Sequence, residues 1–353
     1  MSNRKSNLTL IVDGNWLLMS RLSILRMRIK DEDKLLKELK IMMIKSMNVM
    51  MRNFPQIDNI IFVADGGSWR NGLEIPTFLK KDHITYKGNR EKDKDLDWDK
   101  VFATYDEFVN TLSECDICVS REKGVEGDDW CAYWSKTLNS KNTNVIIWSA
   151  DRDLTQLVHT DLKTKCFTIC WNKNYMTMEL IEHNSDDMDF FFDFDNTVNQ
   201  QLLENISIKA KDIHEIHPMD VVIDKIVRGD AGDNILPIVQ KKGKSSDKLF
   251  RVAQKELDLS MDITRLDEIT AWVDELLNKK TWQGKVDDKT EDQIVEHFEY
   301  NRRLVWLDPS SYPDEVLEKM RNHHVESANN DLSIAMQKIQ AEKNEVTDIL
   351  EEL

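Results

Sequence analysis

The sequence carries the stretch Val125-Glu126-Gly127-Asp128-Asp129-Trp130 and, one predicted strand later, Ser149-Ala150-Asp151-Arg152-Asp153-Leu154. Both stretches place acidic residues where an apolar segment gives way to an amphipathic one. If the strands lie side by side, these carboxylates share a small volume, where like charges raise one another's pKa. Dense carboxylate sites usually hold hard divalent cations such as Mg²⁺, so the pattern predicts a metal site and directs attention to further acids.

The composition excludes a general coat of basic residues for binding polyanions. The 353 residues carry a net charge of −16, and 32% of them are charged. Any contact with nucleic acid must therefore come from local basic patches. No run of 18 apolar residues is present, and we expect no cleavable leader, because the strand-like run after the first five residues has no small-residue cleavage site. We expect a cytoplasmic monomer without membrane contact.

Five cysteines are present, and two pairs of them have spacings that superficially suggest zinc. Cys115 and Cys118 form one pair, and Cys166 and Cys170 form the other. Both pairs lie in apolar, strand-like segments, whereas zinc ligand pairs normally lie on turns. We interpret these cysteines as buried, reduced core residues.

Strand and helix patterns alternate through the first half of the chain. Apolar runs at 8–12 and 60–64 predict buried strands, the first ending in a turn at 13–15, and residues 33–54 show helical spacing without Pro or Gly. Strand, helix and strand in this order predict a parallel βαβ unit. Further helices are predicted at 98–112 and 128–138, and further strands at 117–120, 145–150, 166–171 and 175–178.

Three predicted strands are followed by an aspartate, namely Asp13, Asp65 and Asp151. The carboxyl ends of strands form the binding crevice of open parallel sheets, so we expect these three acids to converge. Glu126 and Asp129, at helical spacing, add to the same rim. The pattern predicts an acidic, metal-binding site there.

Two local basic patches follow from the sequence. The first lies within 68–97, where Tyr86 precedes Lys87 and Arg90; an aromatic residue beside cations is typical of a segment that tracks a phosphate backbone, although a solvated loop has the same composition. The second patch comes after the acidic stretch 229–235. It consists of Lys241, Lys242 and Lys244, with Lys248 beyond them.

Beyond residue 178 the pattern is all-helical. Helices are predicted at 220–228, 248–259, 263–278, 288–308 and 313–323. Residues 327–353 lack Gly and Pro and predict a helical tail, either a frayed surface helix or an appendage that binds a partner.

Taken in order, these motifs resemble those of the 5′-nuclease superfamily of flap endonucleases and 5′→3′ exonucleases, and within it the T-even bacteriophage ribonuclease H branch. Asp13 in Val-Asp-Gly-Asn and Asp65 in Ala-Asp-Gly-Gly match the first two motifs of the family. Residues 126–129 look like its Glu-x-Asp-Asp motif, and residues 149–157 are similar to its Asp-x-Asp-Leu-x-Gln-Leu motif.

The resemblance continues into the second half. Residues 86–90 look like the basic segment beneath the family's arch, and residues 229–235 resemble the acidic entry to its helix-hairpin-helix-type duplex-binding element. The sequence departs from the family after Ile235, where 236–244 retains one glycine instead of several. Phosphate contact in that element is therefore assigned to the lysines of the second basic patch.

The resemblance implies an α/β fold of PIN-like, 5′-nuclease type, with a mostly parallel central sheet flanked by helices and a mainly helical C-terminal domain. It implies a catalytic domain at 1–185, including the basic arch segment at about 68–97, a helical duplex-binding domain at 186–325 and a tail at 326–353.

The implied reaction is hydrolysis of phosphodiester bonds with two Mg²⁺ ions, for which Mn²⁺ is an alternative. By resemblance, the metal-binding and catalytic acids are Asp13, Asp65, Glu126, Asp128, Asp129, Asp151, Asp153, Asp230 and Asp233. Lys87 and Arg90 complete the catalytic set by neutralising the scissile phosphate. Substrate binding is assigned to Arg70, Tyr86, Lys241, Lys242 and Lys244.

The implied substrates are branched, nicked or flapped DNA and RNA–DNA hybrids. The expected role is removal of RNA primers and 5′ flaps during phage DNA replication, in the host cytoplasm. A sliding clamp or a single-strand-binding protein is the expected protein partner.

Three alternatives stay open. A nuclease-fold protein that grips branched DNA without cleaving it has the same motifs. A haloacid-dehalogenase-type phosphatase is suggested by the apolar run 190–192 followed by Asp193-Phe194-Asp195, but it leaves the N-terminal acids unexplained. A PIN-type ribonuclease shares the strand-end acids but is much shorter.

Overall fold

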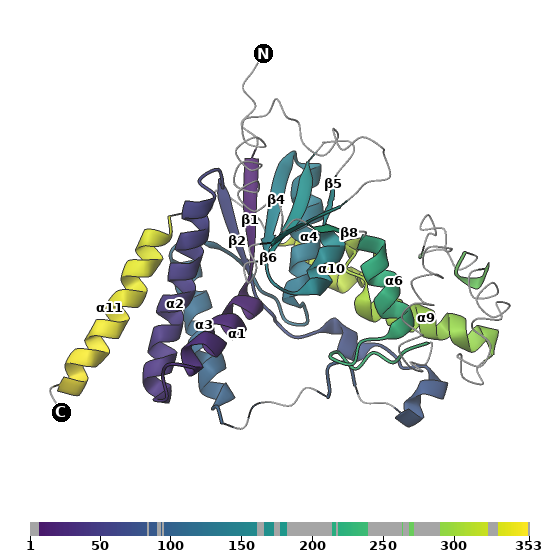
Figure 1. Cartoon of the computed structure of the whole chain (residues 1–353), viewed down its shortest axis with the longest axis horizontal. Coiled ribbons are helices and arrows are strands. Elements are labelled where there is room, and N and C mark those ends of the chain that lie inside the picture. The colour runs from purple at the N-terminus through teal and green to yellow at the C-terminus, as the bar shows by residue number, and fades with distance from the viewer. Residues whose placement is uncertain are drawn as a thin grey trace, which may run out of the picture. The chain divides into compact units, whose positions relative to one another are not determined.

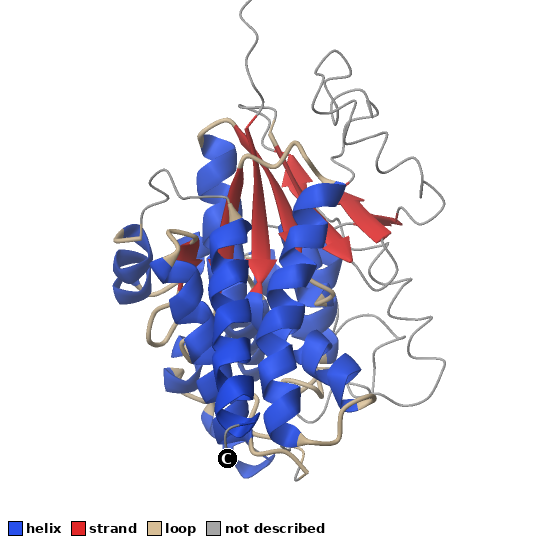
Figure 2. Ribbon diagram, turned by 90° about the vertical axis from the view of Figure 1, so that its left-hand side faces the viewer, coloured by secondary structure: helices blue, strands red, loops and turns tan. Residues whose placement is uncertain are grey.

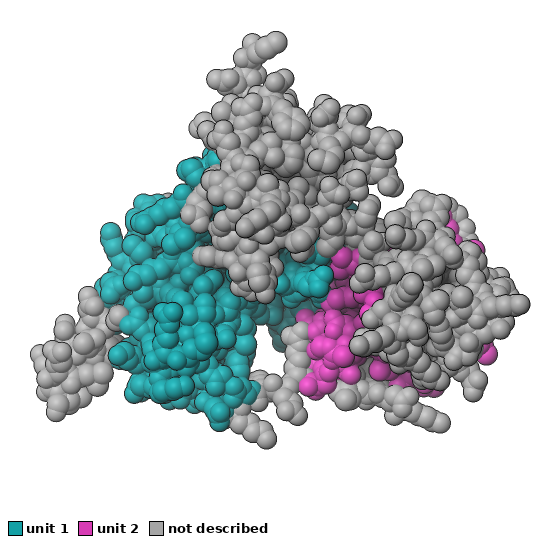
Figure 3. Space-filling view, viewed as in Figure 1, with its two compact units in different colours: residues 1–68, 92–216, 307–353 teal, residues 69–91, 217–306 magenta. Residues whose placement is uncertain are grey.

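The structure is a computed structural model. It describes residues 7–82, 85–89, 93, 95–160, 166–172, 177–181, 214–216, 218–238, 263, 268–271, 290–323 and 331–351. The chain divides into two compact units, coloured teal and magenta in Figure 3. Unit 1 comprises Met1–Ser68, Lys92–Ile216 and Leu307–Leu353, and unit 2 comprises Trp69–Glu91 and His217–Trp306. The units are discontinuous, whereas the sequence predicted contiguous segments with boundaries at 185 and 325.

Unit 1 is built on a mostly parallel sheet, as predicted. Its strands are β1 (Asn7–Asp13), β2 (Asn59–Val63), β3 (Cys118–Ser120), β4 (Thr143–Trp148), β5 (His159–Thr160), β6 (Phe167–Asn172), β7 (Thr177–Ile181) and β8 (His214–Ile216). The order is β3-β2-β1-β4-β6-β7-β8, with β5 paired to β6. β1 pairs in parallel with β2 and β4, whereas β6 and β7 form the predicted antiparallel hairpin. β8 lies where only helices were predicted.

Helices cover both faces of this sheet. Unit 1 contains α1 (Gly14–Arg26), α2 (Glu32–Asn53), α3 (Trp98–Glu114), α4 (Gly127–Ser140), α10 (Asp314–Arg321), α11 (Leu332–Glu351) and the 3₁₀ helices η3 (Arg152–Leu157) and η6 (Pro309–Ser311). α1, α2 and α3 lie on one face and α4 on the other (Figure 1), and Figure 2 shows the strands side by side with helices layered against them. None of the described helices is both long enough and apolar enough to cross a membrane.

The core of unit 1 includes the C-terminal helix. Leu8, Leu10 and Val12 alternate along β1 and are buried in one apolar cluster with α1, α2 and α3. Leu332, Ala335 and Ile339 of α11 belong to this cluster, and α11 lies alongside α2 (Figure 1). The predicted tail is therefore helical, and it is a packed part of unit 1.

The helix α10 also packs within unit 1. Lys319 Nζ donates to the carbonyl oxygen of Lys123 at 2.9 Å, in the loop that precedes α4. The ring of His323 meets that of Trp130 edge-on, with centroids 4.7 Å apart. The helix α10 and the residues just after it thus contact α4 and the loop that precedes it.

The transition from β1 to α1 corrects the turn that was predicted at 13–15. Asp13 ends β1 and caps α1, since its Oδ1 accepts a hydrogen bond of 3.0 Å from the amide of Trp16. A Cβ atom at Gly14 would lie 2.4 Å from the hydroxyl of Tyr105 and 2.5 Å from the ring of Phe62. Glycine here allows helix and neighbouring side chains to approach closely, so the helix begins directly at the end of the strand.

Unit 2 has a separate apolar core. Its elements are α6 (Pro218–Arg228), α9 (Glu291–Val305) and the 3₁₀ helices η1 (Trp69–Gly72) and η2 (Thr77–Asp82). Asn301 on α9 donates to the carbonyl oxygens of Ile226 and Leu236, both at 2.8 Å. Leu73 and Tyr86 pack against this core, which is why the basic segment groups with unit 2.

The cysteines are free thiols. Cys115, Cys131, Cys166 and Cys170 are buried, and Cys118 is partly exposed. Burial confirms the interpretation as core residues for these four, and Cys118 is only partly covered.

Candidate active site

Three acids of unit 1 meet at the carboxyl edge of the parallel sheet. Asp13 ends β1, Asp65 lies two residues beyond β2 and Asp151 lies three beyond β4. Ser149 links two of them: its hydroxyl donates to Asp13 Oδ2 at 2.7 Å and accepts from the amide of Asp151 at 2.9 Å. The predicted convergence of the strand-end acids is therefore present in the structure.

Asp13 is the electrostatic centre of this cluster. Its side chain is buried, with only 5% of the residue exposed. Burial, together with the negative charges of Asp65 and Asp151, raises the pKa of its carboxyl from 3.8 to about 7, against the hydrogen bonds from Trp16 and Ser149, which lower it. An ionised Asp13 therefore needs a positive charge beside it.

Asp65 joins the cluster to the start of α4. Its Oδ1 accepts a hydrogen bond of 2.5 Å from the amide of Gly127, the first residue of α4. Its Oδ2 accepts from the side-chain amide of Asn15. The free amides at the N-terminus of a helix favour a carboxylate, so these contacts hold the Asp65 side chain at a fixed place.

The three acids of the 126–129 stretch have different surroundings. Glu126 is buried, and its Oε2 accepts a hydrogen bond of 2.7 Å from the hydroxyl of Ser68. Asp129 is fully buried and accepts from the amide of Glu126 at 3.2 Å, which stabilises the first turn of α4. Asp128 is partly exposed.

Asp151 and Asp153 lie on the turn that follows β4. Asp151 is exposed and caps η3, because its Oδ1 accepts a hydrogen bond of 2.9 Å from the amide of Asp153. Asp153 is partly exposed. Both carboxylates are therefore accessible to solvent ions.

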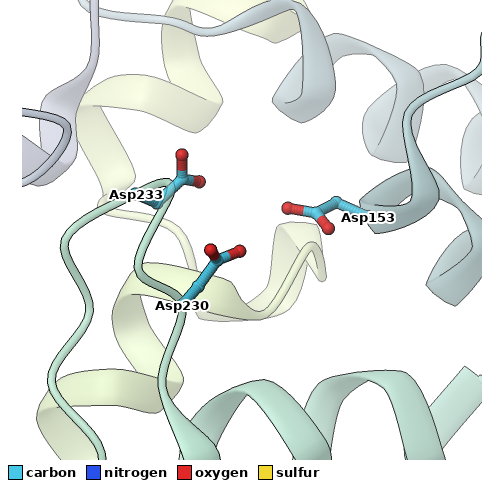
Figure 4. A group of neighbouring side chains, drawn as sticks. All are labelled: Asp153, Asp230 and Asp233. Atoms are coloured by element: carbon cyan, nitrogen blue, oxygen red, sulfur yellow. The ribbon is translucent and has the colours of Figure 1, made fainter. Parts of the chain in front are cut away.

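Unit 2 places two of the predicted acids on one turn, which follows α6. Asp230 and Asp233 each offer a carboxylate oxygen within 4.8 Å of the other, and their side chains project from the same side of the turn (Figure 4). Burial raises the pKa of Asp230, but the ammonium of Lys225 at 2.6 Å and the amide of Gly232 outweigh it and lower the pKa below its ordinary value. Asp230 is thus ionised at neutral pH.

The residues of unit 2 that were predicted to be catalytic cations or to bind substrate differ in accessibility. Lys87 is partly exposed, and its ammonium lies 4.9 Å from the ring centroid of Tyr86. Arg70 is only 2% exposed, with its guanidinium 4.6 Å from the ring centroid of Trp69. Outside the described residues lie Arg90, Lys241, Lys242, Lys244, the stretch 190–198 and most of the segment expected to complete the helix-hairpin-helix-type element.

Several residues that contact the acids or lie within reach of their charges were not predicted. Ser149 lies two residues before Asp151 and could have been noticed from that spacing. Arg121 donates to the carbonyl oxygen of Asp65 at 3.1 Å and to Asp106 at 2.7 Å, but nothing local in the sequence marks it. Tyr105 was also missed, because it lies in the middle of α3 and no neighbouring residue marks it as part of the site.

The donors fit a hard divalent cation. The side chains that converge in unit 1 are carboxylates with hydroxyl and amide partners, which are the oxygen ligands that Mg²⁺ and similar ions prefer. The Tyr105 hydroxyl, on a residue that is 3% exposed, has no hydrogen-bond partner among the described residues, and burial, followed by the charges of Asp65 and Asp13, raises its pKa. Among the described residues, no grouping of His or Cys offers a softer site.

Comparison with protein families supports a relationship that spans this site. The family model for the 5′-3′ exonuclease N-terminal resolvase-like domain matches residues 8–192, which is more than half of the 353 residues. The chain belongs to the 5′-3′ exonuclease family. A 5′-3′ exonuclease of Mycoplasma pneumoniae is 25% identical over 216 residues. The match covers 61% of this chain and 60% of that relative, which is less than two thirds of its length.

Solved structures share the fold of this family member. A flap endonuclease of bacteriophage T5, in a pseudo-enzyme-product complex with DNA and metal ions, superposes with a TM-score of 0.55 at 16% identity, covering 93% of this chain and 99% of that one. The T5 5′-exonuclease with bound zinc gives a TM-score of 0.53 at 16% identity, covering 95% and 99%. These likenesses confirm the predicted fold class; closeness to the T-even ribonuclease H branch stays a prediction.

Proposed function

We propose that the chain is a divalent-metal-dependent, structure-specific 5′ nuclease with 5′→3′ exonuclease and flap endonuclease activity. The observation that carries this proposal is the convergence of Asp13, Asp65 and Asp151 at one sheet edge, with the buried carboxyl of Asp13 at a pKa of about 7. A carboxylate cluster of this kind is stable in its ionised form only beside a cation. Membership of the 5′-3′ exonuclease family gives the chemistry that such a cation serves.

In this proposal Asp13, Asp65, Glu126 and Asp151 hold one Mg²⁺ or Mn²⁺ ion. Asp128, Asp129 and Asp153 are assigned to the same set of metal-binding acids of unit 1. Asp230 and Asp233 of unit 2 are assigned, by resemblance, to metal binding that is largely through waters, as suits Mg²⁺. When bound, two such ions acidify the attacking water and neutralise the charge that develops on the leaving oxygen. Ser149 keeps Asp13 oriented by donating to one of its oxygens, so the other oxygen, which accepts from the amide of Trp16, keeps a fixed direction.

The cationic residues of unit 2 would act on the substrate. Lys87 and Arg90 neutralise the scissile phosphate, and Tyr86 stacks on a frayed terminal base. Arg70 is assigned to assist this basic segment in substrate binding, and Lys241, Lys242 and Lys244 are assigned to phosphate contact in the duplex-binding element. None of these contacts reads a base, so selectivity follows junction shape, and affinity falls steeply with salt because the contacts are to phosphate.

We extend the proposal to RNA–DNA hybrids, and therefore to ribonuclease H activity and the removal of RNA primers during phage DNA replication. The motif order that resembles the T-even branch supports this extension. A sliding clamp or a single-strand-binding protein is the proposed protein partner.

The test is a Mg²⁺-dependent cleavage assay on 5′-flap DNA, nicked duplex and RNA–DNA hybrid. We expect the parent to cleave the flap and Asp151→Asn to lose about 100-fold or more, as is usual when a group that stabilises the transition state is removed. Asp116→Asn is the matched control, because Asp116 is exposed and has a φ of 60° that asparagine tolerates.

Two results would overturn the proposal. Tight binding of the flap without cleavage by the parent would identify a DNA-binding protein of nuclease fold. Phosphate release from a small ester, lost on Asp193→Asn, would identify a phosphatase.

A further inference from the structure

We infer that Asn89 and Asn234 are positioning residues, which anchor the basic segment 85–89 to the acidic turn 229–235 before any substrate binds. This inference rests on the proposed function, because it concerns how Lys87 is held for its proposed work on the scissile phosphate. It adds a direct hydrogen-bonded contact between the segment 85–89 and the turn 229–235, which the sequence motifs do not connect.

Three hydrogen bonds join the segment to the turn. The side-chain amide of Asn89 donates to the carbonyl oxygen of Ala231 at 2.6 Å, and that of Asn234 donates to the carbonyl oxygen of Thr85 at 3.2 Å. Between them, the backbone amide of Lys87 donates to the carbonyl oxygen of Asp233 at 2.9 Å. The partners are 142 and 149 positions apart along the chain for the two asparagines, so no local sequence preference creates these contacts.

The backbone at Lys87 needs this anchoring. Its φ of 57° lies in the left-handed region, where a residue with a side chain is strained. Asn234 has a φ of 58° but tolerates it better, because asparagine is among the residues that visit this region. The hydrogen bond from the Lys87 amide to the carbonyl oxygen of Asp233 is made by the strained residue itself. It offsets the backbone strain at Lys87 only while the turn 229–235 is folded.

The turn is a rigid support. The amide and carbonyl of Asp230 pair with those of Ile235 at 2.9 and 2.8 Å, and Asp230 also accepts from the amide of Gly232 at 2.8 Å. Gly229 has a φ of 68°, and a Cβ there would lie 2.3 Å from the carbonyl oxygen of Ile235, so the turn closes only with glycine at this position. On the other side of the contact, Tyr86 packs against the apolar core of unit 2, to which Ile235 belongs.

The consequence is that the proposed phosphate-binding cation and two proposed metal-binding acids form one preorganised part. Lys87 and Asp233 share a backbone hydrogen bond, and Asp230 lies on the same turn. Preorganisation of a group that acts in the transition state raises kcat, whereas ground-state affinity for DNA comes mainly from the other phosphate contacts. Loosening the anchor should therefore lower kcat and leave KM nearly unchanged.

The test compares Asn89→Ala and Asn234→Gly with the parent. Glycine at 234 removes the donor without adding backbone strain, because it accepts a positive φ. We expect each variant to lower kcat on 5′-flap DNA about tenfold, with KM changed less than twofold. Asn89→Gln, which keeps the amide donor, should recover part of the loss. Asn71→Ala, an exposed asparagine of the same unit, is the control and should match the parent.

Amide hydrogen exchange in metal-free, DNA-free protein supplies a readout independent of catalysis. We expect the Lys87 amide to exchange faster in both anchor variants, while the amides of Asp230 and Ile235 stay as protected as in the parent and report that the turn is intact. If the turn amides also lose protection, the asparagines maintain the fold of unit 2 and the positioning role is overturned.

The remaining outcomes separate this inference from the proposed function. If the parent cleaves DNA and both variants exchange and cleave as the control does, the inference is wrong and the proposed function stands. If exchange at Lys87 rises but kcat does not change, the anchor exists without a positioning role. If the parent cleaves no substrate, the proposed function is wrong, while the exchange experiment still decides whether the asparagines hold the segment.

Discussion

The hydroxyl of Ser149 donates a hydrogen bond of 2.7 Å to Oδ2 of Asp13, although 136 positions separate the two residues along the chain. Ser149→Ala removes this bond and the acceptor for the amide of Asp151. Hydrogen bonds to a charged group contribute roughly 1.5–3 kcal/mol, and a tenfold change in affinity corresponds to about 1.4 kcal/mol. We therefore expect the Mg²⁺ concentration for half-maximal cleavage to rise at least about tenfold, measured by metal titration of flap cleavage.

Ser140→Ala is the control for this substitution, because Ser140 is an exposed serine of α4 whose hydroxyl donates within its own helix, to the carbonyl oxygen of Thr137 at 2.7 Å. An unchanged Mg²⁺ requirement in Ser149→Ala would contradict the role given to the serine.

The raised pKa of Asp13 makes the stability of the metal-free protein depend on pH. The carboxyl has a pKa of about 7 in the folded protein against 3.8 ordinarily, so the unfolded chain releases the proton first. The protonated Asp13 carboxyl favours the folded state over the unfolded state. This stabilisation is fully present below pH 3.8, declines as the pH rises and is lost above pH 7. Asparagine carries no such titration and still caps a helix. In EDTA, Asp13→Asn should gain about 2–3 kcal/mol over the parent between about pH 5 and about pH 8.

Urea denaturation across this pH range measures the effect, and the difference between the two proteins removes the contributions of other titrating groups. Stability curves that stay parallel from acid to alkaline pH would show that Asp13 has an ordinary pKa.

Gly66 holds two loops of the site together. The amide of Gly124 donates to its carbonyl oxygen and its own amide donates to Val125, both at 2.8 Å, while a Cβ at Gly66 would lie 1.9 Å from the carbonyl oxygen of Glu122. Gly66→Ala should therefore push apart the loops that carry Asp65 and Glu126. We expect a loss of about 1–3 kcal/mol in the free energy of unfolding, as for other overpacked sites, and a drop in cleavage.

Gly72→Ala provides the comparison, since nothing lies within 4 Å of a Cβ built there. Its stability should stay within about 0.5 kcal/mol of the parent. Equal stability of the two alanine variants would mean that the loops are not in contact as described.

Two isoleucines on α11 test whether this helix belongs to the core. Ile339 is 1% exposed and Ile334 is 51% exposed. Ile339→Asp buries a charge against the core of unit 1 and should lower the free energy of unfolding by at least about 3 kcal/mol. Ile334→Asp should change it by less than about 0.5 kcal/mol. Similar small losses for both, measured by thermal unfolding, would indicate a helix that is detached in solution.

The parts of the fold that could be predicted are those with local causes. Apolar runs of five or six residues ended by an aspartate marked β1, β2 and β4, and parallel pairing then required Asp13, Asp65 and Asp151 to share an edge. The helix α4 was likewise visible from its apolar spacing. Each of these features depends on residues that are neighbours in the sequence.

The parts that could not be predicted depend on distant partners. α1 begins at a glycine, which locally indicates a turn, because Tyr105 and Phe62 leave no room for a Cβ. β8 has three residues and is defined by its pairing with β7. The bonds from Asn89 and Asn234 have no local signal at all, since the partner of each is a backbone carbonyl more than a hundred positions away.

The discontinuity of unit 1 limits how far this unit can fold while the chain is being synthesised on the ribosome. The chain leaves this unit after Ser68 and again after Ile216, and it returns for the last time at Leu307. The helices that cover α2 and hold the loop before α4 are made after both of these departures. The N-terminal strands therefore reach their final packing only once Leu307–Leu353 has been synthesised, and until then part of the apolar core of unit 1 lacks its cover.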